Sequence, residues 1–157
     1  DYPKCKTQGV VDASFEEITA VIDDLSNYKI IFDSIIISTI NDSNEVRLAM
    51  ELPLFFSNRD YTVKFRTIEN DTSISYIYDS IISKDYPVEE DYIRLIDAQG
   101  GWFLEKIDSS HTLVKYIWNG DMRGDFPKWA YSKAWIKQGI EVISNLRREV
   151  IKRKDVE

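Results

Sequence analysis

The sequence predicts an α+β fold in which one antiparallel sheet curls against a long C-terminal helix. Three observations support this. Between residues 35 and 119, short segments of alternating polarity are separated by turn residues at hairpin spacing. From residue 126 to residue 154, apolar residues recur at helical spacing. No repeat and no linker is visible, so we expect a single domain over residues 1–157.

A strand and a helix are expected before the sheet. Residues 6–14 fit a short strand that runs into a helix start. Ser14 is a suitable N-cap, and Glu17 three residues later completes a capping box. The helix should therefore extend from about Phe15 to Leu25, followed by a second short helix or an irregular turn over residues 26–34.

Seven or eight strands are expected in all, and they should form one continuous antiparallel sheet. The turn signals NDSN, ENDT, AQGG and DSSH and a loop at 84–91 divide the central region. The segments between them cover residues 34–40, 45–52, 59–68, 73–82, 92–97, 101–107 and 112–119. Because a sheet of this size twists strongly, it can curl around one helix and leave an apolar space between the two.

The last segment, from residue 126 to residue 154, predicts a helix that lies on the sheet. Asp125 is a suitable N-cap for it, and Pro127 is tolerated in a first turn. Gly124 lets the chain turn out of the preceding strand. The tripeptide at 123–125, Arg-Gly-Asp, is therefore interpreted as a corner of the fold rather than an adhesion signal.

Composition excludes several classes of function. The 20 basic and 27 acidic residues give a net charge of −7, which argues against nucleic-acid binding. The single cysteine, Cys5, excludes an intrachain disulfide, and no Cys/His metal spacing exists. The single histidine, His111, lies in a turn. With no phosphate loop and no nucleophile elbow, we expect no metal, no cofactor and no catalytic residue, and thus not an enzyme.

Three stretches together resemble the START domains, the steroidogenic-acute-regulatory-protein-related lipid transfer family. They are PLFFSNRDYTVKFR (53–66), DYIRLIDAQGGWFLEKID (91–108) and TLVKYIWNGDMRGDFPKWAYSKA (112–134), in the family's order and spacing. The resemblance implies the helix-grip fold of the wider Bet v 1-like (SRPBCC) superfamily, in which a curved sheet grips a C-terminal helix around a hydrophobic cavity. The chain departs from the family in lacking much of the N-terminal helix and in having Asp121-Met122-Arg123-Gly124 where the family has Asp-Pro-x-Gly.

The resemblance implies binding of a lipid or sterol-like hydrophobic ligand in an internal tunnel, with transfer as a further option. This reading predicts an apolar cavity of at least several hundred Å³, on the order of other ligand pockets. An aromatase/cyclase-like enzyme of the same superfamily, acting on a polyketide or other apolar substrate, is the alternative. A protein-interaction module with an open apolar groove is a third reading.

Candidate ligand-binding residues lie on the strands and on the C-terminal helix. Tyr and Trp suit an amphiphilic ligand because each combines an apolar body with a polar tip. The expected set is Met50, Phe65, Tyr76, Tyr78, Arg94, Trp102, Leu104, Tyr116, Trp118, Trp129, Ile136, Ile140 and Ile143. The last four would form the helix wall of the tunnel. Gly124 and Pro127 would form a gate, because in the family this corner lies near the tunnel mouth.

Arg94 is the one charged member of this set. If its side chain enters an apolar tunnel, it needs a carboxylate partner, since an unpaired buried charge is very costly. Glu51, Asp60 and Asp79 are the candidate partners. Such a pair would hold the polar head of a ligand.

The expected partner is therefore a hydrophobic small molecule, with no nucleic acid, transient membrane contact and a monomeric chain. The sequence starts at Asp1 without a methionine, which fits a trimmed product. The compartment is left open between the cytoplasm and, if a signal peptide was removed, the periplasm or the exterior.

Overall fold

A curved sheet forms the frame of the computed structural model, which describes residues 3–53 and 55–156. The strands run in the order β1-β8-β7-β5-β4-β3-β2, with every neighbouring pair antiparallel. Their bounds are β1 Cys5–Val11, β2 Ile35–Ile40, β3 Glu45–Met50, β4 Asn58–Glu69, β5 Ser73–Ser80, β6 Tyr92–Arg94, β7 Gln99–Lys106 and β8 Thr112–Asn119. The prediction of a wholly antiparallel sheet was wrong at β6, which pairs parallel with the start of β4 because the preceding loop carries the chain back along that edge.

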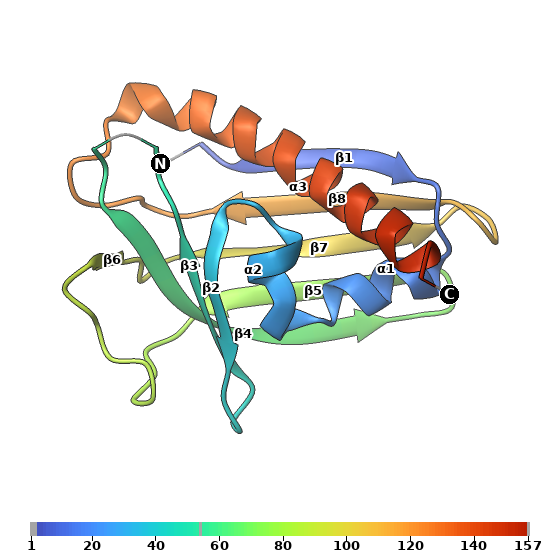
Figure 1. Cartoon of the computed structure of the whole chain (residues 1–157), viewed down its shortest axis with the longest axis horizontal. Helices are drawn as coiled ribbons and strands as arrows, with labels where there is room; N and C mark the ends of the chain where they lie inside the picture. The colour runs from blue at the N-terminus through green and yellow to red at the C-terminus, as the bar shows by residue number, and fades with distance from the viewer. Residues whose placement is uncertain (1–2, 54, 157) are drawn as a thin grey trace.

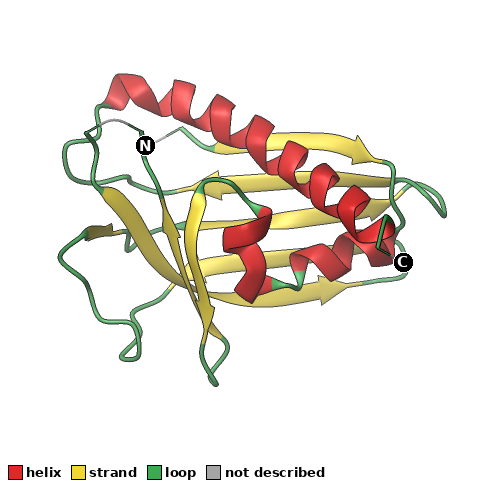
Figure 2. Cartoon of the chain, in the orientation of Figure 1, coloured by secondary structure: helices red, strands yellow, loops and turns green. Residues whose placement is uncertain are grey.

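The helices lie on one face of this sheet (Figure 2). They are α1 Phe15–Ile22, α2 Tyr28–Ile31 and α3 Tyr131–Lys154, with 3₁₀ turns η1 Leu25–Asn27 and η2 Lys128–Ala130. The predicted capping box is confirmed: the Glu17 amide donates to Ser14 Oγ at 3.2 Å and the Ser14 amide to Glu17 Oε2 at 2.6 Å. α3 lies along β1 and α2 lies over β2 (Figure 1), so the helices cover the concave side.

The aromatic residues of the central strands share the inner face of the sheet. Tyr76 lies opposite Trp102, and Trp102 lies opposite Tyr116 in the next strand. Tyr78 and Trp118 follow two residues along their strands, so alternation places them on the same face. All five side chains are buried, as expected for residues on one inner face.

The AQGG segment is not the turn that the sequence predicts, because Gln99, Gly100 and Gly101 begin strand β7. A Cβ on Gly100 would lie 2.1 Å from the Ile117 carbonyl oxygen, and one on Gly101 would lie 2.4 Å from that of Tyr76. The two glycines therefore allow the backbones of neighbouring strands to approach closely. The true turn lies just before them, at residues 95–98.

The predicted helix wall was wrong at three of its four residues. Trp129, Ile136 and Ile140 are 80%, 65% and 64% exposed, so they point to solvent and cannot form a wall of a cavity. The buried stripe lies about a quarter turn around the helix and includes Tyr131, Trp135, Gly139, Val142, Leu146 and Val150. Ile143 lies at its border and is buried. A Cβ on Gly139 would lie 3.1 Å from Thr7 Cβ, so glycine allows α3 to lie close to β1.

Candidate functional site

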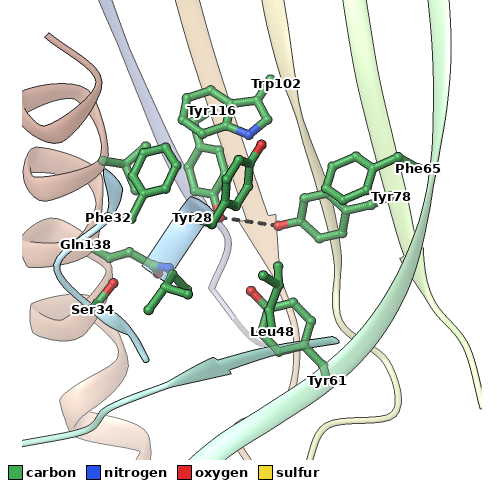
Figure 3. A pocket seen from close by; sticks show the side chains of 12 residues that line it. Tyr28, Phe32, Ser34, Leu48, Tyr61, Phe65, Tyr78, Trp102, Tyr116 and Gln138 are labelled. Carbon is green, nitrogen blue, oxygen red and sulfur yellow. Dashed lines mark hydrogen bonds between the residues drawn. The ribbon is translucent and has the colours of Figure 1, made fainter. Parts of the chain in front are cut away.

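A small cavity lies between the concave face of the sheet and the helices (Figure 3). Its free volume is about 40 Å³. The lining residues come from α2, the following turn, β2 to β5, β7, β8 and α3. They are Tyr28, Phe32, Ser34, Ile35, Leu48, Tyr61, Phe65, Tyr78, Trp102, Tyr116, Gln138 and Val142.

This volume contradicts the prediction of a tunnel of several hundred Å³. A space of 40 Å³ holds only a few water molecules, since one water needs about 10–15 Å³ of such volume. The aromatic rings of the lining fill the rest of the interior: Trp102 lies 5.7 Å from Phe32 and 4.7 Å from Tyr116, centroid to centroid. A larger ligand can enter this cavity only if these side chains turn or the helices move away from the sheet.

A second space, the mouth, lies beside the cavity, between α3 and the loop that follows β3. The mouth has about 100 Å³ of free volume, and it shares Ser34 and Gln138 with the inner cavity. Outside it lies an open cleft of about 370 Å³, lined by Asp33, Ser34, Glu51, Leu52, Pro53, Lys137 and Glu141. The shared lining residues place the three spaces in a row, and this row is the path that a ligand would follow from solvent toward the tyrosine-lined interior.

The inner cavity holds four buried tyrosines: Tyr28, Tyr61, Tyr78 and Tyr116. The hydroxyls of Tyr78 and Tyr116 lie 3.3 Å apart, and that of Tyr28 donates to the Ile22 carbonyl at 2.7 Å. Burial raises the pKa of Tyr61 to about 12 and raises the pKa values of the other three well above the usual 10.0. These phenols are therefore neutral hydrogen-bonding groups at ordinary pH rather than bases.

Gln138 brings an amide into this apolar region from the buried side of α3. Figure 3 shows its side chain reaching from the helix toward the cavity, beside Phe32 and Ser34. The Oε1 atom is buried, and the described residues offer it no hydrogen-bond partner. Helical periodicity groups Gln138 with the polar residues of α3, and the structure places it at the edge of the buried stripe, half-buried.

The predicted apolar residues that are buried or line a space fall into two groups. Phe65, Tyr78, Trp102 and Tyr116 line the inner cavity, and Met50 lines the mouth. The buried remainder packs in the core away from both spaces and comprises Tyr76, Leu104, Trp118 and Ile143. The lining residues that sequence reasoning missed are Tyr28, Phe32, Ser34, Ile35, Leu48, Tyr61, Gln138 and Val142. Many of these belong to the short α2 region and β2, whose orientation depends on how the chain folds back on the sheet.

Arg94 does not enter the cavity, so its predicted ligand-binding role was wrong. Its guanidinium donates to both carboxylate oxygens of Asp60, at 2.8 and 2.7 Å, and to the carbonyls of Tyr86 and Pro87. Asp60 was one of the three predicted partners, but it alternates with the inward-facing Tyr61. The ion pair therefore lies on the convex side of the sheet, where Arg47 also donates to Asp60 at 2.9 Å.

The inward-facing arginine is instead Arg59, which sequence reasoning missed. It is fully buried, and its guanidinium donates to the carbonyls of Ser57, Met122 and Arg123. The nearest described carboxylate is Asp125, 3.8 Å away and exposed. Burial lowers the pKa of this guanidinium. Arg59 thus joins the loop after β3 to the loop before α3, and residues of both loops line the mouth.

The predicted gate residues lie in the second of these loops. Gly124 has a φ of +61°, and a Cβ there would lie 2.6 Å from Ile93 Cδ1 and 3.3 Å from Arg59 Nη2. Pro127 precedes η2 with a φ of −75°. Asp125 is not the predicted N-cap, because no side chain caps η2 or α3. The buried guanidinium of Arg59 holds the loop in its place.

Other classes of site are not found in residues 3–53 and 55–156. No cluster of three or more His, Cys, Asp or Glu residues there could hold a metal ion. None of the helices there is both long and apolar enough to cross a membrane. His111 is half-exposed in the turn between β7 and β8, where its Nδ1 lies 2.8 Å from Asp108 Oδ1.

Comparison with known proteins shows similarity in structure rather than in sequence. No protein-family model and no curated protein matches the chain. Human STARD10 superposes with a TM-score of 0.88 at 17% identity over 99% of this chain, which spans 66% of the STARD10 chain. A STAR-related lipid transfer protein of Xanthomonas axonopodis gives 0.79 at 19% identity, over 91% of this chain and 82% of that fragment. The Zhui aromatase/cyclase of Streptomyces sp. R1128 gives 0.68 at 13% identity, over 96% and 94% of the two chains.

These similarities agree with the order of elements described above. A strand and short helices precede a meandering antiparallel sheet, and a long helix closes its concave side (Figure 1). The predicted helix-grip fold is confirmed. This chain has the fold of the START domains.

Proposed function

We propose that this protein binds a lipid or sterol-like hydrophobic molecule between the concave face of the sheet and α3. The observation that carries the proposal is the path from the surface cleft through the mouth to the tyrosine-lined cavity. Aromatic walls with a few polar tips are typical of sites for amphiphilic ligands. The START proteins with this fold are named for lipid transfer, which supports the same class of ligand.

The small volume of the inner cavity makes this a site that widens on binding. α3 lies against β1, whereas the cavity lies toward β2, β3 and α2, where side chains rather than backbone fill the gap. Movement of Phe32, Val142 and the loop after β3 would join the cavity to the mouth. A ligand that prefers the widened form increases the population of that form. The size of the increase is set by the difference between the ligand's affinities for the two forms.

Contact with a membrane is part of this proposal, because a lipid has to be taken from one. Phe55 and Trp129 lie in the two segments that flank the mouth, and their side chains are 97% and 80% exposed. Aromatic side chains favour the membrane–water interface. We propose that the protein is monomeric and touches the membrane only transiently at this end.

A catalytic role has less support. The described residues that line the inner cavity include no histidine, lysine or carboxylate. The raised pKa values of the tyrosines leave them protonated, so no general base stands beside them. The similarity to an aromatase/cyclase keeps the enzyme as the alternative.

Native mass spectrometry of the purified protein, followed by lipid extraction, tests the proposal. We expect a population with added mass that matches an extracted hydrophobic molecule. Val142→Phe should fill the cavity and reduce the bound fraction, whereas Ile140→Phe on the exposed side of α3 should leave it unchanged. A folded wild-type protein that carries no ligand and binds none from lipid vesicles would contradict the proposal.

A further inference from the structure

We propose that the cavity selects an electrically neutral ligand with a hydroxyl group, and that this hydroxyl pairs with the side-chain amide of Gln138. The proposal rests on the proposed function and specifies its ligand class. It follows from two independent observations: an amide whose hydrogen bonding is incomplete, and the distribution of charge along the path to it.

The amide of Gln138 is the first observation. It lines both the inner cavity and the mouth, so a ligand that enters along the path must pass it. Its Oε1 atom is buried without a hydrogen-bond partner among the described residues. Buried polar atoms in folded proteins are almost always paired, and those left over have an unseen partner or a functional role.

Three of the tyrosine hydroxyls around the cavity already have protein partners. The hydroxyl of Tyr28 donates to the Ile22 carbonyl, and those of Tyr78 and Tyr116 pair with each other. Cys5, deeper in the core, donates to the Trp135 carbonyl. The amide oxygen of Gln138 can therefore accept a hydrogen bond from an entering ligand without the loss of a hydrogen bond within the protein.

A hydroxyl is the group that fits this amide best. Rotation of the amide exchanges its oxygen and its NH₂ group, so the same position presents an acceptor or a donor. A hydroxyl can donate to the first and accept from the second. An ether or ester can only accept, and a hydrocarbon can do neither, so both would leave Oε1 unpaired.

The charge along the path is the second observation. None of the residues that line the inner cavity is charged. The outer cleft is lined by the carboxylates of Asp33, Glu51 and Glu141 and by one cation, Lys137. Arg148 forms an ion pair with Asp33 at 2.8 Å. The path therefore offers no excess positive charge to a carboxylate or phosphate. A charged group in the cavity would be desolvated without a partner, so fatty acids and phospholipid headgroups fit poorly.

Three probes that share one ring system test the proposal: 2-naphthol, 2-methoxynaphthalene and 2-naphthoate. Their dissociation constants for the full chain would be measured by isothermal titration calorimetry at neutral pH. We expect 2-naphthol to bind about tenfold more tightly than 2-methoxynaphthalene, the usual effect of satisfying a buried acceptor. We expect 2-naphthoate to bind most weakly.

The variant Gln138→Leu should abolish the difference between 2-naphthol and 2-methoxynaphthalene while 2-methoxynaphthalene still binds. Ile140→Ala, on the exposed side of the same helix, is the matched control and should keep the tenfold difference. The retained affinity for the ether also shows that the leucine variant is folded.

Equal binding of 2-naphthol and its methyl ether, tightest binding of 2-naphthoate, or a preference that persists in Gln138→Leu would each overturn the proposal. Co-purification of a phospholipid without binding of 2-naphthol would also overturn it, yet leave the proposed function intact. If no probe binds and no lipid co-purifies, both this proposal and the proposed function are contradicted.

Discussion

Arg59 Nε donates to the Met122 carbonyl at 2.9 Å and so connects β4 to the loop before α3, across 63 residues of sequence. The same guanidinium also donates to the carbonyls of Ser57 and Arg123, while its own side chain is fully buried. A ring of backbone acceptors thus substitutes for the carboxylate that a buried cation usually needs. This arrangement fixes one side of the cavity mouth.

Replacing Arg59 by methionine should destabilise the protein by about 2–4 kcal/mol, because three carbonyl groups, that of the buried Met122 among them, lose their donor. Urea unfolding measures this, and hydrogen exchange should show faster exchange at residues 121–127. Arg66→Met, at an exposed position of the same strand, is the control and should change the free energy of unfolding by less than about 0.5 kcal/mol. Equal effects of the two variants would show that the loop does not depend on Arg59.

The gate at Gly124 and Pro127 remains a prediction, and the geometry allows a direct test. Gly124→Ala puts a Cβ within 2.6 Å of Ile93 at a positive φ, which should cost about 1–2 kcal/mol and displace the loop. We expect faster exchange of bound 2-naphthol in stopped-flow fluorescence for this variant and for Pro127→Gly. Exchange rates identical to the wild type in both variants would contradict a gating role for these two residues.

The Asp60 cluster should control stability without affecting ligand binding. Asp60→Asn leaves the buried guanidinium groups of Arg47 and Arg94 without their shared carboxylate, and we expect a loss of about 3–5 kcal/mol. Asp79→Asn, exposed on β5, should have little effect on unfolding by urea. Because the cluster lies on the convex side, the affinity of the remaining folded protein for 2-naphthol should stay within about twofold of the wild type. A larger change in affinity would show that the ion pairs on the convex side influence binding on the concave side.

The tyrosine cluster should make the protein sensitive to alkali. The folded-state pKa of Tyr61 is raised by burial to about 12, above the usual 10.0, so the folded protein holds its proton more tightly than the unfolded chain. Stability is therefore complete below pH 10 and is lost as the pH rises through 10 toward 12. Tyrosinate absorbance at 295 nm should show a group of the nine tyrosines that ionises only on unfolding. A single transition near pH 10 in protein that stays folded would contradict this.

The two tryptophans at the start of the C-terminal helical region should differ sharply in their contributions to the stability of the protein. Trp135 is buried, its ring lies 4.5 Å from that of Trp118, and its Nε1 donates to the Pro3 carbonyl at 2.7 Å. Trp135→Ala should cost about 3–5 kcal/mol, whereas Trp129→Ala should change stability by less than about 0.5 kcal/mol. Thermal unfolding monitored by circular dichroism measures both. If Trp129 proves the more costly, the orientation of α3 described above is wrong.

The sheet could be predicted from sequence because its signals are local. Alternation along each strand places Tyr76 with Tyr78 and Trp102 with Leu104 on common faces whatever the rest of the chain does. The capping box at Ser14 and Glu17 is equally local. The glycines at 100 and 101 gave a wrong prediction of a turn, since a glycine that allows close strand approach carries the same signal as one that makes a turn.

The orientation of α3 could not be predicted because the helix carries two neighbouring apolar stripes. One contains Trp129, Ile136 and Ile140, and the other contains Trp135 and Val142. Helical periodicity predicts the helix from either stripe. The curved sheet meets the second, and Gly139 permits the close approach to β1.

The sequence by itself determined the order of elements, the sharing of faces along strands and the absence of a nucleic-acid binding charge, because these depend on neighbours in the chain. Only the tertiary structure decided that Arg59 rather than Arg94 faces inward, that Gln138 reaches the cavity, and that aromatic rings leave about 40 Å³ free. Each of these depends on how residues far apart in sequence pack together, which no local pattern records.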